Sequence, residues 1–195
     1  MDKMTDPKAQ LISLAKKIGE RGLTISTGGN VSTKLPDGRI VITPTKFHKS
    51  MSDLEAGDLS VIGPKGDRIE GPKPSVELPM HSAIYSVAPN VSWIVHAHTP
   101  LAIAYASEKM LPETSVIEAS SLRLSQIGRE EPGTEALARA VASEVSKGSN
   151  GVFMESHGVV VVSSDANDAY LLLQEIENAC KADLARKLLR SLRIQ

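Results

Sequence analysis

Two histidines stand two positions apart at the end of a short apolar run. Residues 92–100 read Ser-Trp-Ile-Val-His-Ala-His-Thr-Pro, and the β-branched and aromatic residues predict a buried strand that ends in His96 and His98. Residues two apart on a strand project from the same face, so both imidazoles point at one spot. Neutral imidazole is a common ligand of zinc and similar ions, which makes the pair a candidate half-site for a divalent metal. Taken alone, the pair also fits two polar residues at the end of a buried strand.

A third histidine and a glutamate extend this candidate site. His157 lies between two strand-like runs and is followed by Gly158, which permits an abrupt turn. If that turn lies beside the histidine strand, His96, His98 and His157 form a three-imidazole site with one open position, as in catalytic zinc sites. Glu77 offers a carboxylate for that position, as a ligand when it is empty and as a general acid or base once substrate displaces it. Such a site suits carbon–carbon cleavage or proton abstraction next to a carbonyl.

Three short segments contain the groups that bind phosphate. They are residues 27–30 (Thr-Gly-Gly-Asn), residues 43–46 (Thr-Pro-Thr-Lys) and Ser75. Backbone amides, hydroxyls and one ammonium suit a phosphate in a protein that lacks an overall positive charge. Each segment taken singly is also an ordinary turn, because glycine, asparagine, proline and serine dominate turns for conformational reasons.

Other reactive side chains leave alternatives open. His81 stands four residues after Glu77 and shares its expected helix face, so it either orients the carboxylate or is simply a packed or solvent-facing histidine. His48 lies among lysines and a serine and is interpreted as a loop residue, with contact to substrate as the alternative. Cys180 is the only cysteine, which excludes an intramolecular disulfide, and its apolar helical surroundings predict a buried thiol.

Composition narrows the class of protein. A chain of 195 residues with 41% hydrophobic residues buries one substantial core, so we expect a single domain over residues 1–195. The formal charge of −1, with both signs mixed throughout, favours neither nucleic acid nor an anionic membrane as partner. No apolar run approaches membrane-spanning length, and residues 1–7 lack the apolar region of a secretion signal. These features predict a cytoplasmic protein that acts on a small molecule.

The elements that must position these residues begin as strand hairpins and continue as helices interleaved with strands. This order predicts an α/β fold, a single layered domain with a largely antiparallel central β-sheet covered by helices. Signatures of P-loop, dinucleotide-binding, zincin and serine-hydrolase sites are absent. No element is assigned to residues 120–123. Periodicity and capping residues predict helices within residues 7–22, 75–89, 99–107, 134–148 and 165–192, and strands over 31–35, 39–43, 59–62, 67–70, 93–98, 116–117, 151–154 and 159–162.

Five motifs together resemble the class II aldolase and adducin head family. They fall in the family's order and approximate spacing, and the resemblance runs from about residue 11 to the last helix. The motifs are Thr-Gly-Gly-Asn-Val-Ser at 27–32, Ile-Thr-Pro-Thr at 42–45, Pro-Ser-Val-Glu at 74–77, Val-His-Ala-His at 95–98 and Ser-His-Gly at 156–158.

The resemblance implies a zinc-type aldolase, with manganese or cobalt as other suitable ions. Cleavage of a small ketose 1-phosphate such as L-fuculose 1-phosphate would give dihydroxyacetone phosphate and an aldehyde through a metal-stabilised enediolate. It also implies a homotetramer with active sites near the subunit interfaces. Glu77 would bind the empty metal and act as acid and base. The implied metal ligands are Glu77, His96, His98 and His157, and the implied phosphate-binding residues are Gly29, Asn30, Thr45, Lys46 and Ser75.

The sequence also departs from the pattern of the family's aldolases. Lys46 stands where they commonly have glycine, and Val76 replaces a second serine, so the phosphate pocket is altered. Residues 112–129 lack the tyrosine that these aldolases use near the aldehyde. A decarboxylase of 3-oxo sugar-acid phosphates and a dehydratase of a ribulose 1-phosphate derivative would use the same three histidines and glutamate, so fold and metal alone do not decide among them. A non-catalytic scaffold domain is the alternative from another class.

Overall fold

Eight strands form one central sheet in the computed structural model, which describes residues 6–25, 27–45, 49–113 and 120–192. The spatial order is β4-β3-β2-β1-β5-β8-β7-β6. All neighbouring strands are antiparallel except β6 and β7, which are parallel, so the predicted largely antiparallel sheet is confirmed. The strands are β1 (Asn30–Lys34), β2 (Ile40–Ile42), β3 (Ser60–Ile62), β4 (Arg68–Glu70), β5 (Trp93–Ala97), β6 (Leu124–Ile127), β7 (Gly151–Met154) and β8 (Gly158–Ser163).

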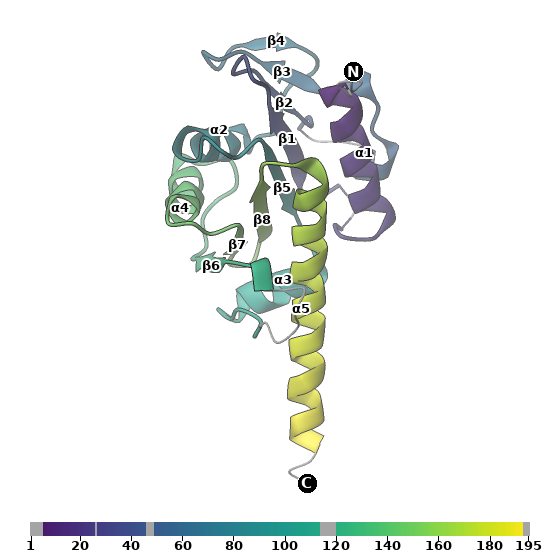
Figure 1. Ribbon diagram of the computed structural model, residues 1–195, viewed down its shortest axis with the longest axis vertical. Coiled ribbons are helices and arrows are strands. Elements are labelled where there is room, and N and C mark those ends of the chain that lie inside the picture. Colours follow the sequence, from purple (N-terminus) through teal and green to yellow (C-terminus); the bar gives the residue numbers. More distant parts are fainter. Residues whose placement is uncertain (1–5, 26, 46–48, 114–119, 193–195) are drawn as a thin grey trace.

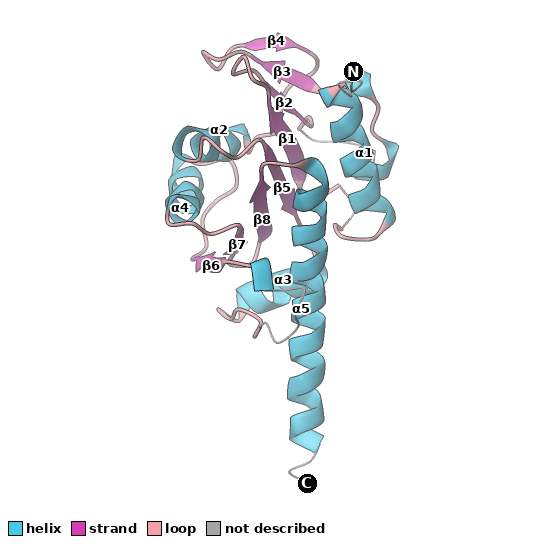
Figure 2. Cartoon of the chain, in the orientation of Figure 1, coloured by secondary structure: helices cyan, strands magenta, loops and turns pink. Residues whose placement is uncertain are grey.

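Helices cover both faces of the sheet and create two apolar cores (Figure 1). Helices α2 and α4 pack on one face, and α1, α3 and α5 pack on the other (Figure 2). The expected α/β fold with helices on the sheet is therefore confirmed. The helices are α1 (Pro7–Glu20), α2 (Leu78–Val87), α3 (Pro100–Ser107), α4 (Glu135–Ser146) and α5 (Ala166–Leu192), with short 3-10 helices η1 (Met51–Asp53) and η2 (Ala56–Asp58).

The alternation of side chains along β5 decides which face receives the histidines. Trp93, Val95 and Ala97 lie in the core beneath α1 and α5, whereas Ile94 lies in the core beneath α2 and α4. Successive strand residues point to opposite faces, so His96 shares the face of Ile94 and projects toward α2. The strand spacing thus delivers His96 to the side of the sheet where Glu77 precedes α2.

Two local expectations differ from the structure, and a third is not tested by it. The edge strand β6 was not predicted, and its four residues are all half-buried, so no inward–outward alternation marks it. The strand candidate at residues 116–117 lies outside the described residues. Helix α2 begins at Leu78 rather than at Ser75, because the Ser75 side chain accepts a hydrogen bond from the Glu77 amide in a turn that precedes the helix.

Helix α5 is much longer than the sheet it covers. Its first half packs in the core through Leu173, Ile176 and Cys180, and its C-terminal half projects beyond the domain with Leu188 and Leu192 exposed (Figure 1). Within the described residues, no helix combines the length and the apolar character that crossing a membrane requires.

Candidate metal centre

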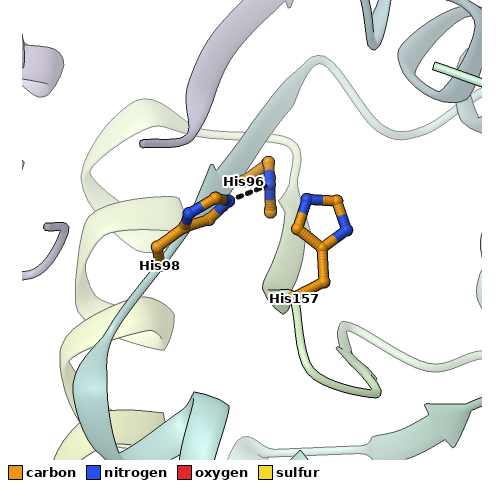
Figure 3. Close-up of side chains that lie close together, drawn as sticks. All are labelled: His96, His98 and His157. Carbon is orange, nitrogen blue, oxygen red and sulfur yellow. Dashed lines mark hydrogen bonds between the residues drawn. The ribbon is translucent and has the colours of Figure 1, made fainter. Parts of the chain in front are cut away.

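The structure brings the three predicted histidines together at one end of the sheet (Figure 3). His96 is the penultimate residue of strand β5, His98 directly follows the strand, and His157 lies in the turn between β7 and β8. Pairing of β5 with β8 places Ala97 opposite Val159, which carries the turn with His157 to the end of the histidine strand. One ring nitrogen from each histidine lies within 4.8 Å of the others, so the residues form a three-histidine cluster.

The turn that carries His157 is unusually tight. Ser156 adopts a left-handed backbone conformation with φ of 57°, and the His157 amide donates to the Met154 carbonyl. A Cβ atom on Gly158 would lie 2.5 Å from the Ala97 carbonyl oxygen, so only glycine lets the two strands approach this closely. The Ser-His-Gly motif therefore has a steric reason as well as a chemical one.

Gly28 leaves room for the His98 ring. A Cβ atom at this position would lie 2.6 Å from His98 Nδ1, although the Gly28 backbone has no left-handed φ that would exclude alanine. We expect Gly28→Ala to displace the imidazole and weaken zinc binding by about 10- to 100-fold, the size typical of residues that support metal ligands. Zinc titration of the metal-free protein measures this effect. Gly57→Ala is the matched control because no atom lies within 4 Å of its added Cβ, and equal affinities of the two variants would contradict the prediction.

Burial keeps His96 and His98 neutral. Desolvation lowers the pKa of His96 to about 3, and desolvation together with the neighbouring His96 lowers the pKa of His98 to about 3. His96 Nδ1 lies 3.1 Å from the Val159 carbonyl oxygen, which only accepts, so Nδ1 holds the proton and Nε2 keeps its lone pair. His96 Nε2 faces His98 Nε2 at 2.9 Å (Figure 3). Neutral imidazoles with lone pairs aimed at a common point are what a divalent cation needs.

Glu77 closes the fourth side of the cluster. It is the residue immediately before α2, and 4% of its surface is exposed. Its Oε2 lies 3.3 Å from His96 Nε2 and accepts a hydrogen bond from Asn30 Nδ2 at 2.7 Å, while Oε1 lies 3.4 Å from His157 Nε2. Oε1 is buried and has no hydrogen-bond partner among the described residues. An unpaired buried carboxylate oxygen is costly, and a cation held by three nitrogens and this oxygen would satisfy it.

A cavity of about 360 Å³ opens in front of the cluster. Four of the five predicted phosphate-binding residues line it, namely Gly29, Asn30, Thr45 and Ser75, and the fifth, Lys46, lies outside the described residues. The Asn30 side chain points toward Glu77, so its amide is already engaged. His48 also lies outside the described residues.

Lys49 is a cavity residue to which the sequence reading gave no role. Its ammonium donates to Asp58 at 3.0 Å and lies 4.0 Å from a Glu55 oxygen, and the bond to Asp58 raises the lysine pKa. The lysine charge at the cavity rim is therefore offset by these carboxylates. Val76 also lines the cavity and is 49% exposed. The cavity therefore lacks the hydroxyl that a serine at this position would supply. In the sequence, the closeness of Lys49 to the Thr-Pro-Thr motif at residues 43–45 was the only feature that could have indicated its place in the cavity.

Sequence relatives cover nearly the whole chain. The 3-oxo-tetronate 4-phosphate decarboxylase of Haemophilus influenzae is 31% identical over 187 residues, which span 91% of this chain and 88% of the relative. The L-fuculose phosphate aldolase of Methanocaldococcus jannaschii is 27% identical over 188 residues, which span 94% of this chain and 98% of that protein.

The fold has a close match among solved structures as well. A structure of L-fuculose 1-phosphate aldolase superposes with a TM-score of 0.84 at 26% identity and covers 95% of this chain and 88% of the aldolase. A sequence profile, Class II Aldolase and Adducin N-terminal domain, matches residues 9–184. The resemblance noted in the motifs is thereby confirmed, and the chain belongs to the class II aldolase and adducin N-terminal domain family.

Proposed function

We propose that this protein is a metal-dependent lyase that removes the carboxyl group of a 3-oxo-tetronate 4-phosphate. The observation that carries the proposal is the convergence of three imidazoles and a buried carboxylate at the base of a cavity lined with hydroxyls and backbone amides. The 31% identity to a decarboxylase of this substrate supports the choice within the family. A scaffold has no need for such a set of ligands.

The four residues of the cluster would hold a zinc, manganese or cobalt ion. The bound ion would supply positive charge that polarises the substrate ketone. Backbone amides around Gly28 and Gly29, with the hydroxyls of Thr45 and Ser75, would bind the phosphate within the cavity.

Glu77 would move the proton. The bond between the carboxylate carbon and its neighbour breaks, carbon dioxide leaves, and the electron pair delocalises into the adjacent ketone. The protonated Glu77 carboxyl then gives its proton to the carbon that has lost the carboxyl group, which yields dihydroxyacetone phosphate. Water then restores the proton of Glu77. Burial at 4% exposure limits the access of bulk water to the carboxyl while substrate fills the cavity, so the proton is restored after the product leaves.

A ketose 1-phosphate aldolase is the second candidate. The superposition on L-fuculose 1-phosphate aldolase at a TM-score of 0.84 favours it. In that reaction Glu77 takes the proton of the substrate hydroxyl, the carbon–carbon bond breaks to release an aldehyde, and the carboxyl returns a proton to the three-carbon fragment. Both reactions give dihydroxyacetone phosphate, so the second product distinguishes them.

An assay of the metal-loaded protein on three substrates decides between these reactions. We expect carbon dioxide and dihydroxyacetone phosphate from 3-oxo-tetronate 4-phosphate, with a higher kcat/KM than for L-fuculose 1-phosphate. Release of an aldehyde from L-fuculose 1-phosphate as the faster reaction would support the aldolase instead. Loss of water from a ribulose 1-phosphate derivative would identify a dehydratase, and absence of turnover on all three substrates would contradict the proposal.

A further inference from the structure

A line of buried polar side chains runs from Glu77 away from the cavity. Asn30 and Ser32 stand two apart on β1, so they share the face of the sheet that α2 covers. His81 and Tyr85 follow Glu77 at four-residue intervals and share one side of α2. The strand period and the helix period therefore bring the five side chains into contact, although they come from two distant segments.

Each neighbouring pair in this line is hydrogen-bonded. Asn30 Nδ2 lies 2.7 Å from Glu77 Oε2, and Asn30 Oδ1 lies 2.5 Å from His81 Nε2. Ser32 Oγ lies 2.6 Å from His81 Nδ1 and 2.8 Å from the Tyr85 hydroxyl. All five residues are at most 6% exposed, so no bulk water competes for these bonds.

The chemistry of the groups gives the line a single direction. The ionised carboxylate of Glu77 only accepts, so Asn30 must present its amide nitrogen to Glu77 and its oxygen to His81. The Asn30 oxygen only accepts, so His81 Nε2 must donate. Burial lowers the pKa of His81 to about 3, so the ring is neutral, Nδ1 carries no proton, and the Ser32 hydroxyl donates to it.

Tyr85 stands at the start of the line. Burial raises the pKa of its hydroxyl well above the usual range, so the hydroxyl keeps its proton and can donate to Ser32 at 2.8 Å or to the Ser92 carbonyl at 3.3 Å. The Ser32 hydroxyl, His81 Nε2–H and the Asn30 amide then each donate toward Glu77.

We propose that His81 is a positioning residue that, through the Asn30 amide, fixes Oε2 of Glu77 as a hydrogen-bond acceptor and leaves Oε1 to exchange the substrate proton. This inference rests on the proposed function, in which Glu77 transfers that proton. It assigns different roles to the two carboxylate oxygens, which the sequence does not distinguish.

The geometry favours proton exchange at Oε1. Oε2 accepts from Asn30 whether the carboxyl is ionised or protonated on Oε1, so the hydrogen bond persists through the reaction and the side chain need not reorient. Oε1 has no hydrogen-bond partner among the described residues. Without the His81 donor, the Asn30 amide would be free to rotate and turn its oxygen toward the carboxylate, where two acceptors would face each other.

Imidazole nitrogen shifts test the direction of the line without any activity. In metal-free and zinc-loaded protein with ¹⁵N-labelled histidine, we expect the His81 ring to show the neutral form protonated on Nε2 at neutral pH. His81→Gln identifies the signals by their loss. A ring protonated on Nδ1 alone would overturn the inference, because Nε2 would then be an acceptor and Asn30 would have to turn its nitrogen toward His81 instead of Glu77.

Kinetics test whether the positioning affects catalysis. His81→Leu removes the donor, and we expect kcat to fall about 10- to 100-fold with little change in KM or in bound metal. His81→Gln keeps an N–H donor and should recover most of kcat. Ile84→Val, a conservative change at a fully buried position one turn away, controls for general loosening of α2 and should keep kcat.

A double-mutant cycle separates a positioning role from a structural one. If His81 acts through Asn30, His81→Leu should cost little further kcat once Asn30→Ala is present. Additive losses, or equal losses in His81→Leu and His81→Gln, would overturn the inference. Inactivity of the wild-type protein on every substrate would contradict the proposed function alone, since the nitrogen shifts would still report the direction of the line.

Discussion

Replacing Glu77 with glutamine is expected to lower kcat by about 10²- to 10⁴-fold, the usual contribution of a general acid or base. Glutamine has the same shape, and its amide oxygen can take the place of Oε2 and accept the bond from Asn30. Its amide nitrogen then takes the place of Oε1, where it can neither accept nor return a proton. The three histidines remain, so the variant should stay folded and keep bound metal.

Steady-state kinetics on the metal-loaded variant, with metal content measured on the same samples, checks this prediction. Glu177→Gln is the matched control, because Glu177 is also 4% exposed and its carboxylate accepts from the Ala102 amide, a role that an amide oxygen can keep. The control should retain nearly all of kcat. Near-normal turnover by Glu77→Gln would remove Glu77 from the mechanism.

The sheet and the grouping of His96 with His98 were predictable because local patterns determine them. Short runs of β-branched and aromatic residues marked the buried strands, and the period of two placed His96 and His98 at one strand end. The sequence placed His157 in a turn between two apolar runs, but its position beside the histidine strand depends on the pairing of β5 with β8, which the runs alone do not specify. The family motifs then joined these segments to Glu77, which lies in the same cluster.

Features that depend on distant partners were not predictable in the same way. Strand β6 lies at a sheet edge, is half-buried throughout and pairs in parallel with β7, so its own pattern carries little signal. The orientation of Asn30 depends on Glu77 and His81, about 50 residues away along the chain. The two-residue spacing on β1 and the four-residue spacing along α2 are both visible in the sequence. Only the packing of α2 against β1 shows that these side chains are hydrogen-bonded to one another.

Replacing His157 with alanine is expected to abolish stoichiometric metal binding. The cluster would keep two imidazoles and one carboxylate, and water would enter the open side. The affinity for zinc should therefore fall by more than about 100-fold, which is the upper end for residues that only support the metal ligands. His157 lies in a turn and not within a strand, so its loss leaves the sheet pairing intact. Elemental analysis after dialysis, together with zinc titration of the metal-free protein, measures the effect.

Glu155→Ala is the control for the turn itself. Glu155 lies two residues before His157 in the same turn, and its side chain pairs with Lys109 at 3.6 Å. This control should bind about one metal ion per chain with unchanged affinity, because a single three-nitrogen centre is intact. A full metal complement in His157→Ala would show that the ion is held elsewhere, and then the unpaired oxygen of Glu77 would need another explanation. Loss of metal in both variants would instead mean that the fold of the turn, rather than the His157 donor, governs binding.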